Sequence, residues 1–513
     1  MDHSPTARKK RSLPLPSKRL LAWLCALLLA ASTLPLYVLS LYNHPYYDDY
    51  QFSADVHAAW SETRSLQAVL QAALKSAASI RASWQGTYTG TILSNLQPGV
   101  FSESLYFLTT FVLLTAFVLC FGFFLKVLFG DLLGLDRPSL VILISLTLTL
   151  LVQLMPDPDE AFFWFNGGIG NTFIYSLLVL SLGLCARLLR TASRGAPIFL
   201  TLALLILMVL LGGGSYGGGL FGLCLYLGLT AWAFVRRWPK APLLLMFTLV
   251  FLGCFLYNMS APGNAVRAGV IASSISPVKA VAQALYYGTA LAGSFLSLPL
   301  LGVTALVLPF LYTAAKASPF SFSHPWLWLL GGLGLFCTQL VPPLYGGVFI
   351  GGGRIVDTYW LSFVVLWLLY AFYLTGFALR RLEKAGRAHL PASFPAPVKQ
   401  GLVLASALVL VVGCLGYKRP ADKTYGLPNL AGMSAALSIV TGEARQYDRE
   451  MTAREVLLND ASQPEITLSP LSVVPELFMK DQLTLDAGET VRLMLQKYYG
   501  KTAIHLAGEE AAP

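Results

Sequence analysis

Residues 105–130 read LYFLTTFVLLTAFVLCFGFFLKVLFG, a run long enough to cross the hydrocarbon core of a bilayer as a helix. Similar runs recur along the whole chain of 513 residues, of which 56% are hydrophobic and 12% charged. The mean hydropathy is +0.63. A soluble protein of this size carries roughly twice that charged fraction. The composition therefore predicts an all-α polytopic membrane protein.

The first apolar run, residues 20–41, follows a basic N-terminus at residues 1–19. A cleaved signal peptide is the alternative for this run, but the run exceeds the usual apolar region of about 7 to 15 residues. An uncleaved span is therefore favoured, and about eleven spans are expected in total. The others are predicted at 105–130, 139–155, 168–187, 197–213, 216–235, 241–259, 292–315, 325–344, 356–379 and 400–416.

Basic residues cluster beside the apolar runs, which is the positive-inside pattern of cytoplasmic loops. The positive-inside distribution of basic residues thus explains the net charge of +10, and no nucleic-acid partner is expected. The expected location is the inner (plasma) membrane, as a multi-pass protein. The odd number of spans predicts a cytoplasmic N-terminus and an extracytoplasmic C-terminus. The basic tracts comprise Arg8, Lys9, Lys10, Arg11, Lys18 and Arg19, then Arg187, Arg190 and Arg194, then Arg236, Arg237 and Lys240, then Arg380, Arg381, Lys384, Arg387 and Lys399.

The pattern divides the chain into a transmembrane domain at residues 20–416, with an outer loop at 42–104, and an extracytoplasmic domain at 417–513. The second domain is charged, and we expect a small α/β or mostly helical unit with helices near 434–459 and 488–499 and a strand at 465–468. Residues 280–294 predict an amphipathic helix at the outer interface. The seven cysteines lie inside apolar runs without metal-ligand spacing, so no metal site is expected from them.

The first candidate site is Tyr46-Tyr47-Asp48-Asp49-Tyr50, where two adjacent carboxylates lie among aromatic rings just beyond the first span. One carboxylate could act as general base on an acceptor hydroxyl, while its neighbour orients it or binds a cation. The aromatic rings offer flat faces for sugars or lipid head groups. The alternative is a solvated turn whose acids cap the next helix, and these residues alone leave both interpretations open.

The second candidate site, residues 156–168, reads PDPDEAFFWFNGG. Its acids lie directly beside an aromatic segment broken by glycines. Such an irregular backbone is tolerated at membrane depth where it is buried or lines a cavity. An interfacial aromatic belt would explain the Phe and Trp residues but not Glu160, Asn166 and Asn171. We therefore expect Glu160, Trp164 and Asn166 to bind a substrate.

The third candidate site is cationic, because Arg267 and Arg354 fall on the outer side against the positive-inside trend. A guanidinium offers a planar fork that suits a phosphate group. The alternatives are an ion pair, such as Arg354 with Asp357, or a side chain that extends to the interface.

These motifs together resemble the GT-C superfamily of membrane glycosyltransferases, which have many spans, an acidic motif in the first large outer loop and a lipid-phosphate sugar donor. The chain is similar also to an uncharacterised bacterial multi-pass membrane family with this layout. The matching segments are Asp48-Asp49, residues 160–168, Gly263-Asn264-Ala265-Val266-Arg267 and Tyr498-Tyr499. An arginine expected after Trp84 is absent, since the chain continues Gln85-Gly86.

The resemblance implies transfer of a sugar from a polyprenyl-phosphate donor to an extracytoplasmic glycan, lipid or protein acceptor, with inversion. It implies Asp48 or Asp49 as the base, and Arg267 and Arg354 as ligands of the departing phosphate. Membrane lipid is the other expected partner, and no cofactor is expected, although a divalent cation is an option. The remaining predicted substrate-binding residues are Glu160, Trp164, Asn166, Asn264 and Trp84.

Two other functions are consistent with the sequence. A transporter or flippase of lipid-linked saccharides would explain the glycine-broken helices, although the spans carry almost no charge for ion coupling. A non-catalytic envelope assembly protein would act through residues 417–513.

Overall fold

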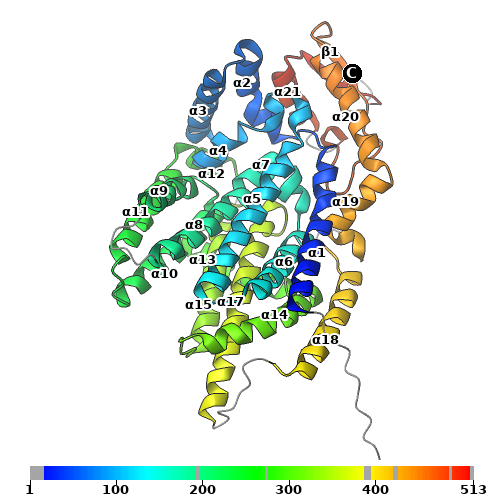
Figure 1. The fold of residues 1–513 in the computed structure, drawn as a ribbon. Helices are drawn as coiled ribbons and strands as arrows, with labels where there is room; N and C mark the ends of the chain where they lie inside the picture. The colour runs from blue at the N-terminus through cyan, green and yellow to red at the C-terminus, as the bar shows by residue number, and fades with distance from the viewer. Residues whose placement is uncertain are drawn as a thin grey trace, which may run out of the picture.

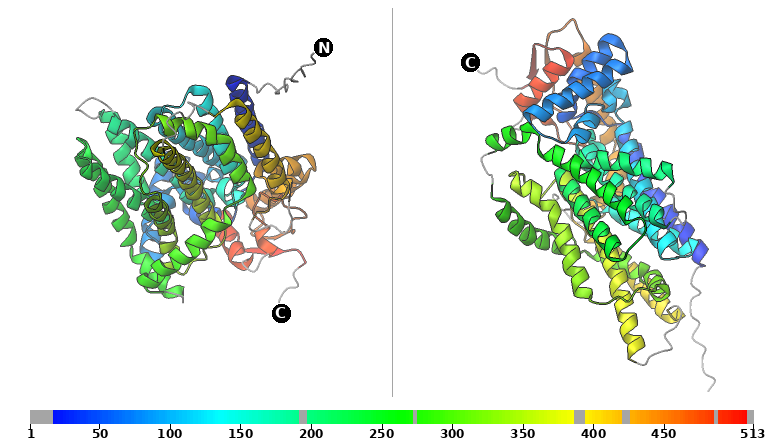
Figure 2. Two further views of the ribbon diagram at one scale, coloured as in Figure 1. Left: turned by 90° about the horizontal axis from the view of Figure 1, so that it is seen from below. Right: turned by 90° about the vertical axis from the view of Figure 1, so that its left-hand side faces the viewer.

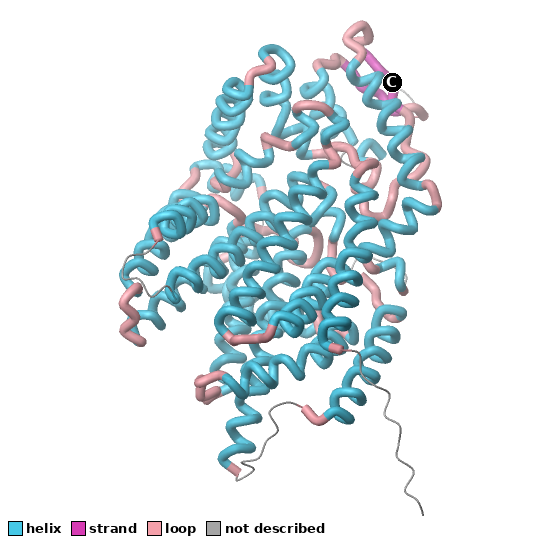
Figure 3. Tube along the Cα trace, in the orientation of Figure 1, coloured by secondary structure: helices cyan, strands magenta, loops and turns pink. Residues whose placement is uncertain are grey.

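The computed structural model describes residues 17–190, 197–271, 275–385, 394–419, 426–484 and 488–508. The predicted N-terminal basic tract at residues 8–11 lies outside these residues, as do Arg194 and Arg387. The described chain is mostly helical, with one two-stranded sheet (Figure 3). By length and composition, nine of its helices can cross a membrane, so the fold is that of a helical polytopic membrane protein.

The membrane-length helical stretches agree closely with the spans that the sequence predicts. The nine are Lys18–Ser40, Glu103–Leu132, Phe165–Arg190, Tyr216–Val235, Ala241–Met259, Leu298–Ala317, Pro325–Tyr345, Arg354–Lys384 and Val398–Leu415. Two shorter apolar helices, Arg137–Gln153 and Ile198–Gly212, occupy the other two predicted positions.

Figure 1 labels the elements as follows. The α-helices are α1 (Lys18–Ser40), α2 (Asp48–Thr63), α3 (Leu66–Ser83), α4 (Tyr88–Ser94), α5 (Leu108–Leu125), α6 (Arg137–Gln153), α7 (Phe165–Gly168), α8 (Ile174–Arg190), α9 (Ile198–Gly212), α10 (Tyr216–Val235), α11 (Ala241–Met259), α12 (Pro262–Val270), α13 (Pro277–Ser294), α14 (Leu298–Ala317), α15 (Pro325–Cys337), α16 (Val341–Tyr345), α17 (Arg354–Lys384), α18 (Ala396–Leu415), α19 (Ala431–Val440), α20 (Glu443–Asn459) and α21 (Gly488–Tyr499). The 3₁₀ segments are η1 (Pro98–Val100), η2 (Glu103–Leu105), η6 (Thr338–Leu340), η7 (Leu427–Asn429) and η8 (Gln482–Thr484). The π-helical segments are η3 (Lys126–Leu132), η4 (Asp159–Phe163) and η5 (Ile169–Phe173), and the strands are β1 (Glu465–Leu468) and β2 (Ala503–Leu506).

The predicted span at 292–315 begins too early. Helix α13 continues to Ser294, and α14 begins only at Leu298. Ser297 has an extended backbone and Pro299 occupies the first turn of α14, which suits a helix start. Because the residues on both sides of this break are apolar, hydropathy alone does not reveal it. Helix α13 buries its Ala280, Ala284 and Gly288 face.

The C-terminal region begins with a helix that packs on the membrane-spanning bundle. Helix α19 lies beside α1 at one edge of the bundle (Figures 1 and 2). The Gln153 side chain joins the two helices, since it donates to the Ser32 carbonyl at 3.0 Å and accepts from the Gly432 amide at 2.8 Å. The apolar residues of α19 thus belong to the main core together with those of α1.

Gly432 allows this close approach, and its replacement gives a first prediction. A Cβ atom at Gly432 would lie 2.0 Å from the Ser32 carbonyl oxygen, a backbone atom that cannot rotate away. We expect Gly432→Ala to destabilise the protein by about 1–3 kcal/mol through overpacking. The measurement is thermal unfolding in detergent, with Gly401→Ala on α18 as control because that position meets open space. Equal melting temperatures for the two variants would contradict this packing.

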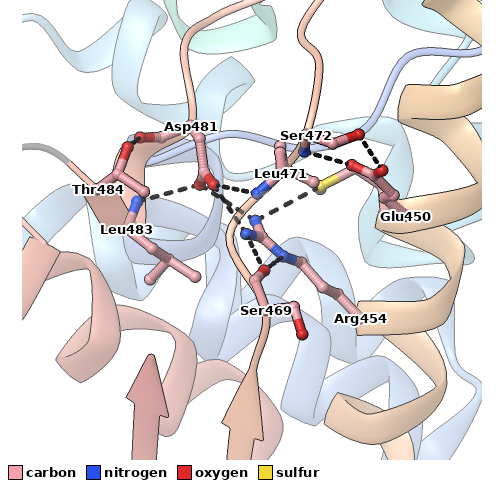
Figure 4. Close-up of polar contacts among 9 residues, drawn as sticks. Glu450, Arg454, Ser469, Leu471, Ser472, Asp481, Leu483 and Thr484 are labelled. Carbon is pink, nitrogen blue, oxygen red and sulfur yellow. Dashed lines mark hydrogen bonds and ion pairs between the residues drawn. The ribbon is translucent and has the colours of Figure 1, made fainter. Parts of the chain in front are cut away.

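The rest of the C-terminal region forms a small βαβ unit on α20. The strand predicted at 465–468 is confirmed as β1. It pairs in parallel with β2, and helix α21 lies between the two strands in the chain. A buried ion pair holds the loops of this unit to α20, because Arg454 donates to both carboxylate oxygens of Asp481 at 3.1 and 2.8 Å (Figure 4). Asp481 also accepts from the Leu471 and Leu483 amides.

Candidate functional site

Helices α2, α3 and α21 lie together at one end of the bundle (Figure 1). We call this the site end; the C-terminus of α17 marks the opposite end (Figure 2). Four segments meet at the site end: the first turn of α2, the π-helical segment η4 with α7, helix α12, and the first turn of α17.

Asp49 is completely buried and acts as an anchor between these segments. Its Oδ1 accepts from the Asn166 backbone and side-chain nitrogens at 3.1 and 2.9 Å. Its Oδ2 accepts from the Tyr106 hydroxyl and from the Tyr46 amide. The carboxylate of Asp49 therefore has no accessible lone pair for a substrate. The side-chain amide of Asn166 donates to Asp49, so it is not directed at a substrate.

Asp48 is the more accessible acid. It is partly buried, and its carboxylate makes no hydrogen bond within the described part of the chain. The preceding residue, Tyr47, has φ 42° and ψ −107°, a conformation that costs a non-glycine residue on the order of 1–3 kcal/mol. Asp48 and Asp49 differ in their surroundings because Asp49 faces Tyr106 and Asn166. Burial raises the pKa of Asp48, the Arg354 guanidinium opposes this, and the charge of Glu160 adds to it.

Arg354, Glu160 and Trp164 form a compact cluster beside Asp48. Glu160 Oε2 accepts from the Arg354 backbone amide at 3.0 Å and lies 3.5 Å from its Nη1. The guanidinium of Arg354 lies 4.6 Å from the centre of the Trp164 ring, within range of a cation–π interaction. Gly353, at φ 68°, allows the close approach, because a Cβ there would lie 3.0 Å from Glu160 Oε1.

The ion pair of Arg354 with Asp357 that the sequence suggested does not form; Arg354 pairs with Glu160 instead. Asp357 accepts from the Asp157 amide at 2.8 Å. Nearby, burial and the charges of Asp157 and Glu160 raise the pKa of Asp159 to about 7. Within the described ranges, no three His, Cys, Asp or Glu side chains are arranged to hold a metal ion.

A second cluster surrounds Arg267 on α12. Its Nη1 donates to Gln85 Oε1 at 3.1 Å, and its guanidinium lies 5.2 Å from the centre of the Trp84 ring. Asn264 accepts from the Tyr216 hydroxyl at 2.5 Å and donates to the Asn258 and Met259 carbonyls. Asn264 is therefore occupied in fixing α12.

The two clusters are electrostatically connected. Burial lowers the pKa of Arg267; a nearby tyrosine opposes this, and the charge of Arg354 lowers the pKa further. The two guanidinium groups are thus close enough to repel each other, and an anion between them would relieve that repulsion. Among the described residues, Arg267 forms no ion pair with a carboxylate.

Sequence reasoning missed one cation of this site, Arg81. Its Nη2 donates to the Tyr257 carbonyl at 3.1 Å, its guanidinium lies 4.0 Å from that ring's centre, and its buried Nε has no described hydrogen-bond partner. Arg81 lies in the predicted outer loop, where the positive-inside trend disfavours arginine. The same signal that identified Arg267 could therefore have identified Arg81.

The structure thus sorts the predicted residues into three groups. Asp48, Glu160, Trp164 and Arg354 share one cluster. Trp84, Asn264 and Arg267 share a second cluster. Asp49, which is buried, and Asn166, which is partly buried, are hydrogen-bonded to each other next to the first cluster.

Burial of Asp49 gives a second prediction. Burial raises the pKa of Asp49 to about 7, although its hydrogen bonds oppose this. The folded protein therefore binds this proton more tightly than the unfolded chain, so stability falls as pH rises from about 4 to about 7, by on the order of 4 kcal/mol from this residue. We expect the difference in melting temperature between pH 5 and pH 8 to shrink in Asp49→Asn and to persist in the exposed control Glu62→Gln. An unchanged difference in Asp49→Asn would contradict the assignment.

The fold and the site define a class, that of helical polytopic membrane proteins with a cluster of acids, arginines and aromatic rings at one end. Comparisons with protein-family models, curated proteins and solved structures find no match to this chain. Function is therefore argued from the site.

Proposed function

We propose that the protein transfers a sugar from a polyprenyl-phosphate-linked donor to an extracytoplasmic acceptor, namely a cell-surface glycan, a lipid or a protein. The observation that carries the proposal is the arrangement of Asp48, a carboxylate without a described hydrogen bond, beside Arg354, with a second arginine, Arg267, within electrostatic range. A base next to a pair of cations suits a reaction in which a hydroxyl loses a proton while a phosphate departs.

In this mechanism the acceptor oxygen attacks the anomeric carbon from the side opposite the phosphate. A bond forms between that oxygen and the carbon, and the bond from the carbon to the phosphate oxygen breaks. The hydroxyl proton passes to Asp48, whose pKa is raised by burial and which is therefore a stronger base than an exposed aspartate. The product has inverted configuration.

The cations hold the charge that develops on the lipid phosphate. Arg354 is fixed by Glu160 and by the Trp164 ring, so its fork is oriented before the substrate arrives. Arg267 is fixed by Gln85 and Trp84. The partly exposed ring of Tyr46, whose centre lies 5.7 Å from that of the buried Trp164 ring, would contact the sugar.

A lipid-linked donor suits the surroundings of the second cluster. Tyr257, Val266 and Val270, near Arg81 and Arg267, are each more than half exposed. Apolar side chains beside unpaired arginines match a molecule with a phosphate at the end of an isoprenoid chain. The proposal places the site end outside the plasma membrane, since the basic tracts flank the opposite ends of the spans.

The test is transfer of radiolabelled sugar from synthetic polyprenyl-phosphate donors by the purified protein in nanodiscs. Product formation or donor hydrolysis by the wild type supports an enzyme of this class. Absence of turnover with a broad donor panel, together with passage of labelled lipid across proteoliposomes, would instead establish a transporter of lipid-linked saccharides.

A further inference from the structure

Residues 41–47 connect α1 to α2 and lead directly into Asp48, the first residue of α2, and they are held from two sides. On one side, the Asn43 side chain donates to the Phe163 carbonyl at 2.6 Å, next to the bonds of Asp49 with Asn166. On the other side, His44 Nε2 lies 3.0 Å from Asp448 Oδ1 on α20. The segment that leads into the proposed base is therefore in direct contact with the C-terminal region.

Helix α21 extends this contact along α2. The Tyr498 ring stacks on His57 at 4.2 Å and meets the Tyr50 ring edge-on at 5.2 Å. Tyr50 and Ala54 of α2 share one apolar cluster with residues of α20, α21 and both strands. At the surface, Lys497 and Asp55 form an ion pair at 2.9 Å.

Glu103 of η2 lies where these elements meet. Its Oε1 accepts from the Tyr50 hydroxyl of α2 and from the Tyr499 hydroxyl of α21, both at 3.2 Å. Its Oε2 is buried without a hydrogen-bond partner among the described residues. Glu103, Tyr50 and Glu455 line a cavity of about 20 Å³, which has room for one water molecule.

The geometry points to Glu103 as a positioning residue for the reaction. By accepting from both tyrosines, Glu103 fixes the first turn of α2 against α21, and Asp48 begins that turn, two residues before Tyr50. A displacement of about 1 Å at a reacting group lowers the rate on the order of 10²-fold. The C-terminal region is thereby part of the framework of the site. This inference rests on the proposed function for its effect on catalysis, but its structural part is measurable without it.

The test compares two replacements of Glu103 that differ in their ability to accept a hydrogen bond. Glu103→Gln keeps an acceptor oxygen, and Glu103→Leu keeps only the approximate shape. We expect Glu103→Leu to lower kcat about 10²-fold with the KM for the donor unchanged, and Glu103→Gln to stay within about 3-fold of wild type. Equal loss in both variants, or equal loss in kcat and in donor binding, would overturn the positioning role.

Hydrogen–deuterium exchange in nanodiscs provides a readout that does not depend on turnover. It also tests the inference if the Glu103→Leu variant fails to fold. We expect the amides of residues 48–53 to exchange about 10-fold faster in Tyr499→Phe than in wild type. The matched control is Tyr286→Phe, which removes an exposed hydroxyl on α13 and should leave these amides unchanged. If the wild-type protein shows no transferase activity but exchange is faster in Tyr499→Phe, the proposed function is rejected and the coupling of α2 to α21 is still supported. Unchanged exchange in Tyr499→Phe would reject the coupling itself.

Discussion

Asp48→Asn is expected to lower the rate of sugar transfer by about 10²–10⁴-fold, the range that a general base contributes. The amide has nearly the shape of the carboxylate but cannot take a proton from the acceptor hydroxyl. Because Asp48 makes no hydrogen bond within the described chain, the substitution breaks none, and the melting temperature should stay within a few degrees of the wild-type value. The measurement is transfer of labelled sugar in nanodiscs at saturating donor, together with thermal unfolding.

Two controls make this result specific. Glu62→Gln removes an exposed carboxylate near the end of α2 and should keep nearly full activity. Asp49→Asn replaces an acceptor oxygen by an NH₂ group that faces donors, so it should lower both stability and activity. Full transfer by Asp48→Asn, or by the double variant Asp48→Asn/Asp49→Asn, would reject the assignment of the base to this loop.

The spans were predictable because each depends on a local property, the hydropathy of about twenty consecutive residues. The predictions at 216–235 and 241–259 match α10 and α11 residue for residue. The same criterion failed at the start of α14, where apolar residues continue through a break in the helix. The packing of α19 on α1 could not be predicted from the sequence either, because it depends on contacts of Gly432 with Gln153 and Ser32, which are far away in the sequence.

For the site, the sequence indicated the right segments but not the separate roles of Asp48 and Asp49. Adjacent aspartates look alike in a sequence, and their difference comes from Tyr106 and Asn166, which lie 57 and 117 residues beyond Asp49. Proximity in the sequence also suggested the wrong ion-pair partner for Arg354, namely Asp357. An ion pair three residues apart on one helix is the local expectation, yet the partner is Glu160, 194 residues away.

Arg354→Gln is expected to lower kcat by about 10²–10³-fold, the effect of removing one preorganised donor from a site of developing charge. The loss should fall on kcat more than on the KM for the donor, because the phosphate gains charge as its bond to the sugar breaks.

Arg354→Lys tests the fork itself. A lysine restores the charge but offers a single ammonium instead of a planar pair of donors, so we expect it to recover only part of the rate. Arg64→Gln, which removes an exposed arginine at the far end of α2, is the matched control and should leave transfer unchanged. If Arg354→Gln raised the KM for the donor with kcat unchanged, Arg354 would bind the phosphate equally in the ground state and in the transition state. Stabilisation of the departing group would then rest on Arg267, and the two effects can be separated by making Arg267→Gln in both backgrounds.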